Sequence, residues 1–239
     1  MSTHLLLAST STVYGSPYLS YLKEDITRFF QGKSKIVFIP YARPGGVSWE
    51  DYTSAASEVF ASIGVEMKGI HEWPEKTEAL VWAEGFFTGG GNTFVLLNTL
   101  QEEGLIPLLQ DQINTGKPYM GTSAGSNIAG QTISTTNDMP IVYPQSFDAL
   151  QMVPFNINPH YLDPMEGSTH MGETRETRIN EFHHFNEIPV AGLREGTALE
   201  IHGDQLSIIG DHAVRVFRAG KKPAEISSSQ ELASILGIS

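Results

Sequence analysis

The sequence predicts an α/β fold with a mainly parallel central sheet, helices on both faces of the sheet and an antiparallel C-terminal extension. Three observations predict it. Short apolar runs alternate with helix-like stretches through the first half of the 239 residues. Two glycine clusters, at 89–91 and 121–125, each stand between an apolar run and a helix-like stretch. In the second half, two alternating runs flank a Gly-Asp pair, which is typical of a β-hairpin. Because no long Ser/Gly-rich linker divides the chain, we expect residues 1–239 to form a single domain.

The first half predicts strands and helices in alternation. Residues 5–8 and 35–40 are short apolar runs, the second ending at a proline, and each predicts a buried strand. Ser48 begins a helix that runs to Ile63, because acidic residues fill its first turn and Gly64 ends it. The further elements are strands at 66–73, 85–88 and 118–121 and helices at 75–84, 93–102 and 105–114. Continuous apolar strands of this kind belong to a parallel sheet that is covered on both faces.

The second half predicts antiparallel strands. Residues 198–202 and 205–209 form the predicted hairpin, and residues 213–217 form a further alternating strand. A helix at 173–185 and a strand at 189–193 precede them. We expect the antiparallel strands to extend the main sheet.

The composition excludes several classes of function. The chain carries 15 Lys and Arg against 27 Asp and Glu, a formal net charge of −12. Binding to nucleic acid or to an anionic membrane surface depends on Lys and Arg, so we expect neither partner. The absence of cysteine excludes disulfides, thiolate zinc sites and a cysteine nucleophile. No run approaches the ~20 apolar residues of a membrane span, and the N-terminus lacks a basic signal-peptide region, so we expect a cytoplasmic protein.

A candidate nucleophile stands in the segment Gly121-Thr122-Ser123-Ala124-Gly125. The segment follows a predicted strand and precedes a helix-compatible stretch, as a nucleophile elbow requires. Such a turn exposes the Ser123 hydroxyl at the carboxyl end of the sheet. The Ala124 N–H then begins a helix and can face an oxyanion. The alternative is a glycine-rich turn that contains an incidental serine.

The second glycine cluster, Gly89-Gly90-Gly91-Asn92, also joins a strand to a helix. We expect its backbone to supply the second oxyanion donor, with the Gly90 amide as the first choice. It lacks both the Lys-Ser/Thr of a phosphate-binding P-loop and the spaced glycines of a dinucleotide-binding loop. A simple tight turn is the alternative. Ligands collect at such strand ends in open α/β sheets.

A nucleophilic serine needs a base and an orienting acid. Of the eight histidines, His160 is the candidate base, because Pro159 fixes the backbone before it and an apolar run precedes both. The candidate acids are Asp138, Asp163, Glu166 and Glu195. An alternative is a metal site made by His170 with Glu173, or by His183 and His184 with nearby carboxylates. Adjacent histidines on a helix diverge, so we expect no metal.

Seven segments, in order, resemble the peptidase E family of serine peptidases, the α-aspartyl dipeptidases, whose fold is like that of class I glutamine amidotransferases. The segments are residues 38–42, 88–94, 121–127, 136–141, 157–160, 172–179 and 192–196. The resemblance runs nearly from end to end. It departs from the family at Thr122, where relatives carry a bulkier Trp, and at Ser126, where they carry Ala.

The resemblance implies a triad with Ser123 as nucleophile, His160 as base and Glu195 as acid. Asp138 also matches a family position that is regarded as functional. The implied reaction is hydrolysis of dipeptides with an N-terminal aspartate, through an acyl-enzyme and without a cofactor. The implied partner is a small peptide, and the chain is expected to be a monomer or a homodimer. The alternatives are a cyanophycinase-like, aspartate-directed peptidase and a non-catalytic, amidotransferase-like binding protein.

Recognition of an acidic substrate by an acidic protein must be local. A planar guanidinium matches a carboxylate bidentately, so an arginine is the expected partner. Arg175 and Arg178 lie in a segment that matches the family, and their spacing puts both on one side of a helix. We favour Arg178 slightly, with Arg43 as the next candidate; surface pairing of both arginines with nearby glutamates is the alternative.

Overall fold

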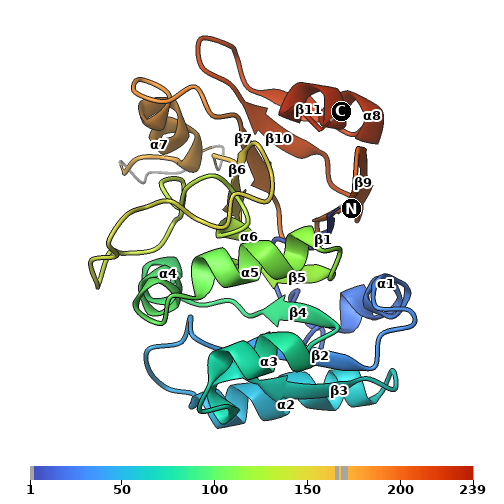
Figure 1. Ribbon diagram of the computed structural model, residues 1–239. Helices are drawn as coiled ribbons and strands as arrows, with labels where there is room; N and C mark the ends of the chain where they lie inside the picture. Colours follow the sequence, from blue (N-terminus) through green and yellow to red (C-terminus); the bar gives the residue numbers. More distant parts are fainter. Residues whose placement is uncertain (1–2, 165–166, 168–171, 239) are drawn as a thin grey trace.

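The structure, a computed structural model, describes residues 3–164, 167 and 172–238. A seven-stranded sheet has the order β3-β2-β4-β5-β1-β8-β9 (Figure 1). Its strands are β1 (His4–Ala8), β2 (Lys35–Ile39), β3 (Glu66–Gly69), β4 (Gly85–Thr88), β5 (Tyr119–Thr122), β8 (Ala198–His202) and β9 (Gln205–Ile209). The first five run parallel, and β8 and β9 add an antiparallel extension beside β1. The predicted fold class is confirmed.

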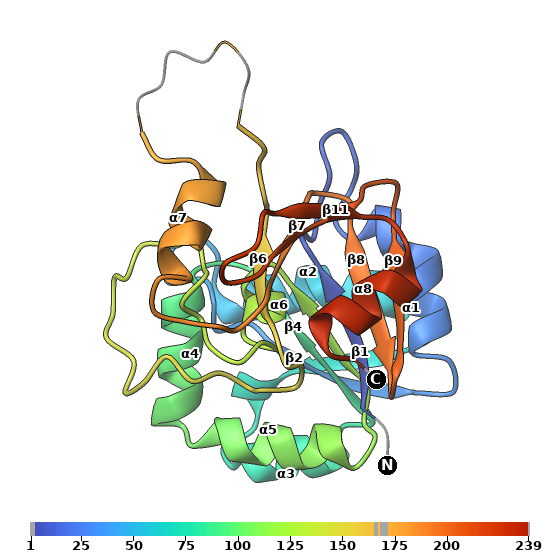
Figure 2. The same ribbon diagram turned by 90° about the horizontal axis from the view of Figure 1, so that it is seen from above.

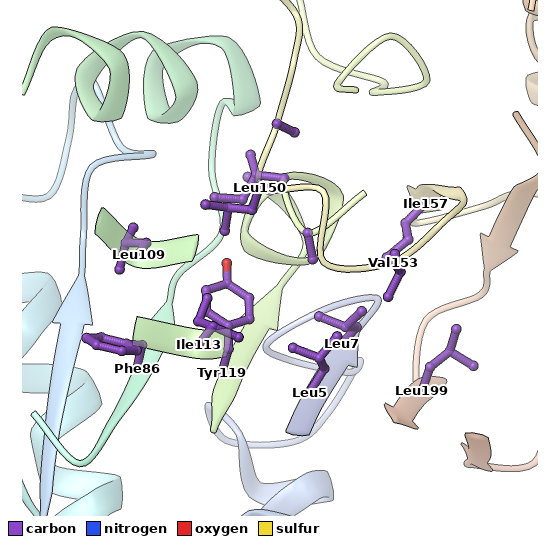
Figure 3. Close-up of a cluster of buried hydrophobic side chains, with 14 of the residues drawn as sticks. Leu5, Leu7, Phe86, Leu109, Ile113, Tyr119, Leu150, Val153, Ile157 and Leu199 are labelled. Atoms are coloured by element: carbon purple, nitrogen blue, oxygen red, sulfur yellow. The ribbon is translucent and has the colours of Figure 1, made fainter. Parts of the chain in front are cut away.

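Alternating side chains give the main sheet two apolar faces. Helices α1 (Lys23–Phe29) and α2 (Trp49–Ala61) pack on the face that contains Leu6 and Phe38. Helices α3 (Lys76–Trp82), α4 (Thr93–Glu102) and α5 (Leu105–Asn114) pack on the face that contains Leu7 and Tyr119. Figure 3 shows this second face, where side chains from β1, β4, β5 and α5 meet those of residues 149–157. Both faces are therefore covered, as a buried parallel sheet requires.

A second, four-stranded sheet has the order β11-β10-β7-β6. Its strands are β6 (Asn156–Pro159), β7 (Val190–Leu193), β10 (Val214–Phe217) and β11 (Ala224–Ile226). The prediction that residues 213–217 extend the main sheet is wrong: β10 pairs antiparallel with β7 and β11. The strand β6 was not predicted, because its polar sequence, Asn-Ile-Asn-Pro, lacks an apolar pattern.

Three further helices, α6 to α8, occur among the described residues. Helix α6 (Ala124–Asn127) follows the predicted nucleophile and contacts both β5 and β6, and it lies between the two sheets in Figure 1. Helix α7 (Arg175–Phe182) packs on the second sheet through Ile179, and Figure 2 shows it on the flank opposite α1. Helix α8 (Ser229–Leu236) closes the chain.

Most predicted bounds agree with the structure, and the differences have local causes. The strand predicted at 66–73 ends at Gly69, where a 3-10 turn (Ile70–Glu72) begins and where a Cβ would overlap the His71 ring. The helix predicted at 173–185 is shorter, because the Thr174 hydroxyl caps it by accepting from the Thr177 N–H at 3.1 Å. Helices α1 and α8 were not predicted; they span seven and eight residues.

One apolar cluster joins the two sheets, since Ile157, Leu193 and Val216 pack into the same core as Leu7 and Tyr119. This shared core favours the prediction of a single domain. Within the described ranges, no helix is long and apolar enough to cross a membrane. The carboxyl ends of β4, β5, β6 and β7 carry the polar residues that the sequence singled out.

Candidate active site

Ser123 sits on a strained turn between β5 and α6. Its backbone has φ 53° and ψ −111°, in the left-handed half of φ that non-glycine residues rarely adopt. The chain can turn this sharply because its flanking glycines lack side chains: a Cβ on Gly121 would overlap the Gly125 carbonyl, and one on Gly125 would overlap the Thr88 carbonyl. The Ser123 N–H donates to the Ala8 carbonyl at 3.0 Å. The turn thus has the geometry of a nucleophile elbow.

A chain of hydrogen bonds joins Ser123, His160 and Glu195. The His160 Nε2 atom lies 3.0 Å from Ser123 Oγ, and its Nδ1 atom lies 2.8 Å from Glu195 Oε1. The three residues follow three different strands, β5, β6 and β7. The His160 and Glu195 side chains are 38% and 51% exposed, so substrate and water can reach the imidazole. The arrangement has the nucleophile–base–acid order of a hydrolytic triad.

The buried Ser9 hydroxyl holds the base in place. The His160 N–H donates to Ser9 Oγ at 2.9 Å, and the Ser9 hydroxyl donates to the Leu193 carbonyl at 2.8 Å. His160 itself has φ 51°, so its orientation depends on such fixed contacts. Ser9 was not predicted as a site residue; the one local signal in the sequence is its place directly after the first strand.

Buried asparagine side chains fasten β6 to the rest of the site. The Asn127 amide donates to the Ile157 carbonyl at 2.8 Å, which ties α6 to β6. The Asn158 amide donates to the Thr135 carbonyl at 2.7 Å and to Asn137 Oδ1 at 2.8 Å. These bonds explain how a polar strand can be buried.

The backbone supplies candidate oxyanion donors on two sides of Ser123. The Ala124 N–H begins α6, ahead of the first bond of that helix, in which Ser126 N donates to Ser123 O. The Gly90 N–H, which the sequence favoured as the second donor, already donates to the Tyr52 hydroxyl at 2.9 Å. In the same loop, Gly89 and Asn92 donate to backbone carbonyls. Among the described residues, the Gly91 N–H has no acceptor, so it is the amide of this loop that is left for a ligand.

Asp138 caps a helix. Its Oδ2 atom accepts from the Thr93 N–H at 2.7 Å, from the Thr93 hydroxyl at 2.6 Å and from the Thr136 hydroxyl at 3.0 Å. The Thr93 N–H is in the first turn of α4, where a carboxylate is favoured. In the part of the chain that the structure describes, Asp138 makes no hydrogen bond to Ser123 or His160.

The two arginines of α7 differ in their surroundings. Arg178 is 55% exposed, and its Nε lies 3.5 Å from a Glu173 carboxylate oxygen. Arg175 is half-buried and near Asp138, and burial lowers the pKa of its guanidinium, with the neighbouring Arg178 contributing and Asp138 opposing. Among the described residues, Arg175 forms no ion pair, whereas Arg178 does.

The remaining candidates lie elsewhere or have structural partners. Asp163 pairs bidentately with Arg194, at 2.7 and 2.8 Å. Glu166 and His170 lie outside the described residues. No group of three or more His, Asp or Glu that could hold a metal occurs in the described ranges. At the two positions that depart from the family pattern, Thr122 is fully buried, and Ser126 Oγ lies 2.7 Å from both the Ala8 and the Gly121 carbonyl oxygens.

Comparisons with known proteins identify the family of the chain. The family model for peptidase family S51 matches residues 5–209. "Peptidase E" of Streptomyces coelicolor is 43% identical over 98% of this chain and 96% of its own, and "Probable alpha-aspartyl dipeptidase" of Drosophila melanogaster is 41% identical over 98% and 97%. The crystal structure of a peptidase from an acI-B1 Actinobacterium, 18% identical, matches the fold with a TM-score of 0.69 over 95% of this chain and 96% of its own. The chain belongs to peptidase family S51 and is a serine peptidase.

Proposed function

We propose that the protein is a dipeptidase that hydrolyses dipeptides with an N-terminal aspartate, using Ser123, His160 and Glu195. The observation that carries the proposal is the hydrogen-bonded sequence from Ser123 Oγ through the imidazole to Glu195 Oε1. The full-length relatives named peptidase E and α-aspartyl dipeptidase supply the substrate class.

The proposed reaction is acyl transfer. His160 Nε2 takes the hydroxyl proton as Ser123 Oγ attacks the peptide carbonyl, and the same nitrogen then gives the proton to the leaving amine. Glu195 accepts a hydrogen bond from Nδ1, fixes the tautomer and stabilises the imidazolium. Water, deprotonated by His160, attacks the aspartyl ester, releases aspartate and restores the serine.

Two backbone amides stabilise the tetrahedral oxyanion in this proposal. The Ala124 N–H is one donor, as the sequence predicted. The Gly91 N–H replaces the predicted Gly90 amide as the second donor, because the Gly90 amide is already bonded to Tyr52. Donors fixed before the reaction do not have to reorganise as the negative charge develops.

Arg175 is the proposed partner of the substrate's aspartyl carboxylate, in preference to Arg178. Arg175 is half-buried, where a charged hydrogen bond is worth more than at the surface. Arg178 is exposed and pairs with Glu173, so in this proposal it forms a surface ion pair and does not bind the substrate. Asp138 holds the start of α4, and Glu195 is the acid of the triad.

A panel of dipeptides tests the function. Asp-Leu should be cleaved, whereas Glu-Leu, Asn-Leu and acetyl-Asp-Leu should be poor substrates. Arg175→Met should lower kcat/KM for Asp-Leu by about 10–10²-fold, as expected when a charged hydrogen bond is lost, and should affect Asn-Leu much less. Arg178→Met is the matched control. Cleavage of an aspartate-rich polymer without turnover of Asp-Leu would instead favour a cyanophycinase-like activity. The cytoplasmic location and the monomeric or dimeric state remain predictions.

A further inference from the structure

The Tyr52 side chain contacts both the N–H and the carbonyl oxygen of Gly90, which lies in the loop beside Ser123. It lies on α2, and its side chain is buried. Its hydroxyl accepts from the Gly90 N–H at 2.9 Å and lies 3.3 Å from the Gly90 carbonyl oxygen, to which it can donate. Arg43 Nε donates to the same carbonyl at 3.3 Å, and the Arg43 guanidinium stands 5.0 Å from the centre of the Tyr52 ring. One side chain thus contacts a glycine peptide at two points, and a second side chain supports it.

These contacts determine the direction of the next amide. The Gly90 carbonyl and the Gly91 N–H belong to one planar trans peptide, so they point in opposite directions. When Tyr52 and Arg43 hold the carbonyl on their side, the Gly91 N–H must point away from them. The positive charge of Arg43 at the carbonyl oxygen also polarises this peptide and strengthens its N–H as a donor.

The rest of the loop would allow a different orientation. Gly89 donates to the Ile39 carbonyl at 3.2 Å and Asn92 to the Ala42 carbonyl at 2.7 Å, so backbone bonds fix both ends. Between them lie two glycines, and Gly91 has φ 146°; because glycines lack the Cβ that restricts φ and ψ, the backbone conformation alone does not fix the orientation of the peptide that joins them. A Cβ on Gly90 would stand 2.9 Å from Ser123 Cβ, which shows how closely this peptide approaches the nucleophile.

We propose that Tyr52, supported by Arg43, is a positioning residue that orients the Gly90–Gly91 peptide so that the Gly91 N–H faces the developing oxyanion at Ser123. The inference rests on the proposed acyl-transfer function and adds the device that aims one of its donors. Tyr52 acts through the peptide and does not touch the substrate.

Tyr52→Phe tests the proposal because it keeps the buried ring and removes only the hydroxyl. Removal of an oxyanion donor costs about 10²–10³-fold in kcat, so a donor that is misdirected part of the time should cost about 10–10²-fold. The KM for Asp-Leu should stay within about twofold, because the interaction is made mainly in the transition state. Tyr41→Phe is the matched control: it removes another buried tyrosine hydroxyl, one that donates to Glu103 at 2.7 Å, away from the loop.

Arg43→Met is the second variant and does not endanger folding, since Arg43 is exposed. It should lower kcat less than Tyr52→Phe and leave KM unchanged. Arg43 also lines a cavity of about 540 Å³ with Trp49 and Val95. A rise in KM with unchanged kcat would therefore assign Arg43 to substrate binding and overturn its role in the proposal.

The rate at which an alkyl fluorophosphonate labels Ser123 gives a readout that does not depend on the aspartyl substrate. We expect Tyr52→Phe to slow labelling by a factor similar to its loss in kcat. Tyr41→Phe should be labelled at the wild-type rate. If the wild type is labelled but does not cleave Asp-Leu, the proposed substrate is wrong, and the labelling ratio still decides the role of Tyr52. Wild-type kcat and labelling in Tyr52→Phe would overturn the proposal, as would equal losses in both tyrosine variants.

Discussion

The half of the site that carries Ser123 and the half that carries His160 and Glu195 are held in different ways. Backbone packing in the seven-stranded sheet holds Ser123, because Gly121 and Gly125 lie too close to neighbouring carbonyls to accept any side chain. Polar side chains hold the other half: the Ser9 hydroxyl bonds the His160 N–H, and the amide of Asn158 ties β6 to the loop that precedes it.

The two halves also differ in exposure and in chemical task. Ser123 follows a fully buried strand, whereas the His160 and Glu195 side chains are 38% and 51% exposed. A nucleophile needs one fixed direction of attack, whereas a base must exchange protons with substrate and water. Substitutions in the half that carries Ser123 should therefore lower the rate of the reaction alone. Substitutions in the half that carries His160 and Glu195 should lower both the rate and the local stability.

The largest loss of activity is expected from a substitution of Ser123 itself. Ser123→Ala should lower kcat for Asp-Leu by about 10⁴-fold or more, because only the oxyanion donors and substrate binding remain. Its thermal unfolding should match that of the wild type, since alanine fits the same turn. Near-normal hydrolysis by the purified variant would contradict a serine mechanism.

Substitutions of the carboxylates Glu195 and Asp138 should have different effects. Glu195→Gln should lower kcat by about 10²–10⁴-fold, because the imidazolium loses the charge that stabilises it. Asp138→Asn should instead lower the free energy of unfolding by about 0.3–1 kcal/mol, through loss of the charge at the start of α4, with a much smaller fall in kcat. Steady-state kinetics and urea unfolding of both variants make the test. An inactive Asp138→Asn beside an active Glu195→Gln would reverse the assignment.

The smallest effect, on stability, is expected from removal of the ion pairs of Arg194, next to Glu195. Arg194, next to Glu195, donates to Asp163, to Glu225 and to the Ala213 carbonyl. These bonds hold the pKa of Asp163 and of Glu225 below the ordinary values of 3.8 and 4.5. Both carboxylates are substantially exposed, so Arg194→Met should cost only about 1–2 kcal/mol at pH 7.

The pH dependence of that loss follows from the direction of the shifts. A lowered carboxyl pKa stabilises the fold above the unfolded-state pKa, and the contribution disappears as pH falls through the folded-state pKa. Urea unfolding should therefore show a constant difference between wild type and Arg194→Met from pH 7 to about pH 5, which shrinks below that. A difference that stays the same down to pH 3 would show that Arg194 stabilises by packing alone.

The same contrast explains which features the sequence could predict. Apolar runs and glycine-flanked turns are local signals, and they predicted β4, α4, α5 and the hairpin β8–β9 with the observed bounds. The strand β6 depends on amide bonds from Asn127 and Asn158 to distant carbonyls, which no local pattern indicates.

Within the site, the resemblance to the peptidase E family implied a triad of Ser123, His160 and Glu195, and the structure brings the three side chains within hydrogen-bond distance. No local pattern could show that the Gly90 amide already has a partner, because its acceptor, the Tyr52 hydroxyl, is 38 residues away in the chain. The helical spacing that put Arg175 and Arg178 on one side of a helix cannot distinguish a half-buried position from an exposed one a turn away, so the choice between them stays a prediction.

The most direct test of the account asks whether the two halves act as one unit. Wild type and His160→Gln are incubated with an alkyl fluorophosphonate. Mass spectrometry then identifies the labelled residue and measures the rate of labelling. The account predicts a single adduct on Ser123 in the wild type, with labelling of His160→Gln slower by about 10²-fold or more, because the serine has lost its base. An adduct on another residue, or equal labelling rates in the two proteins, would contradict the account.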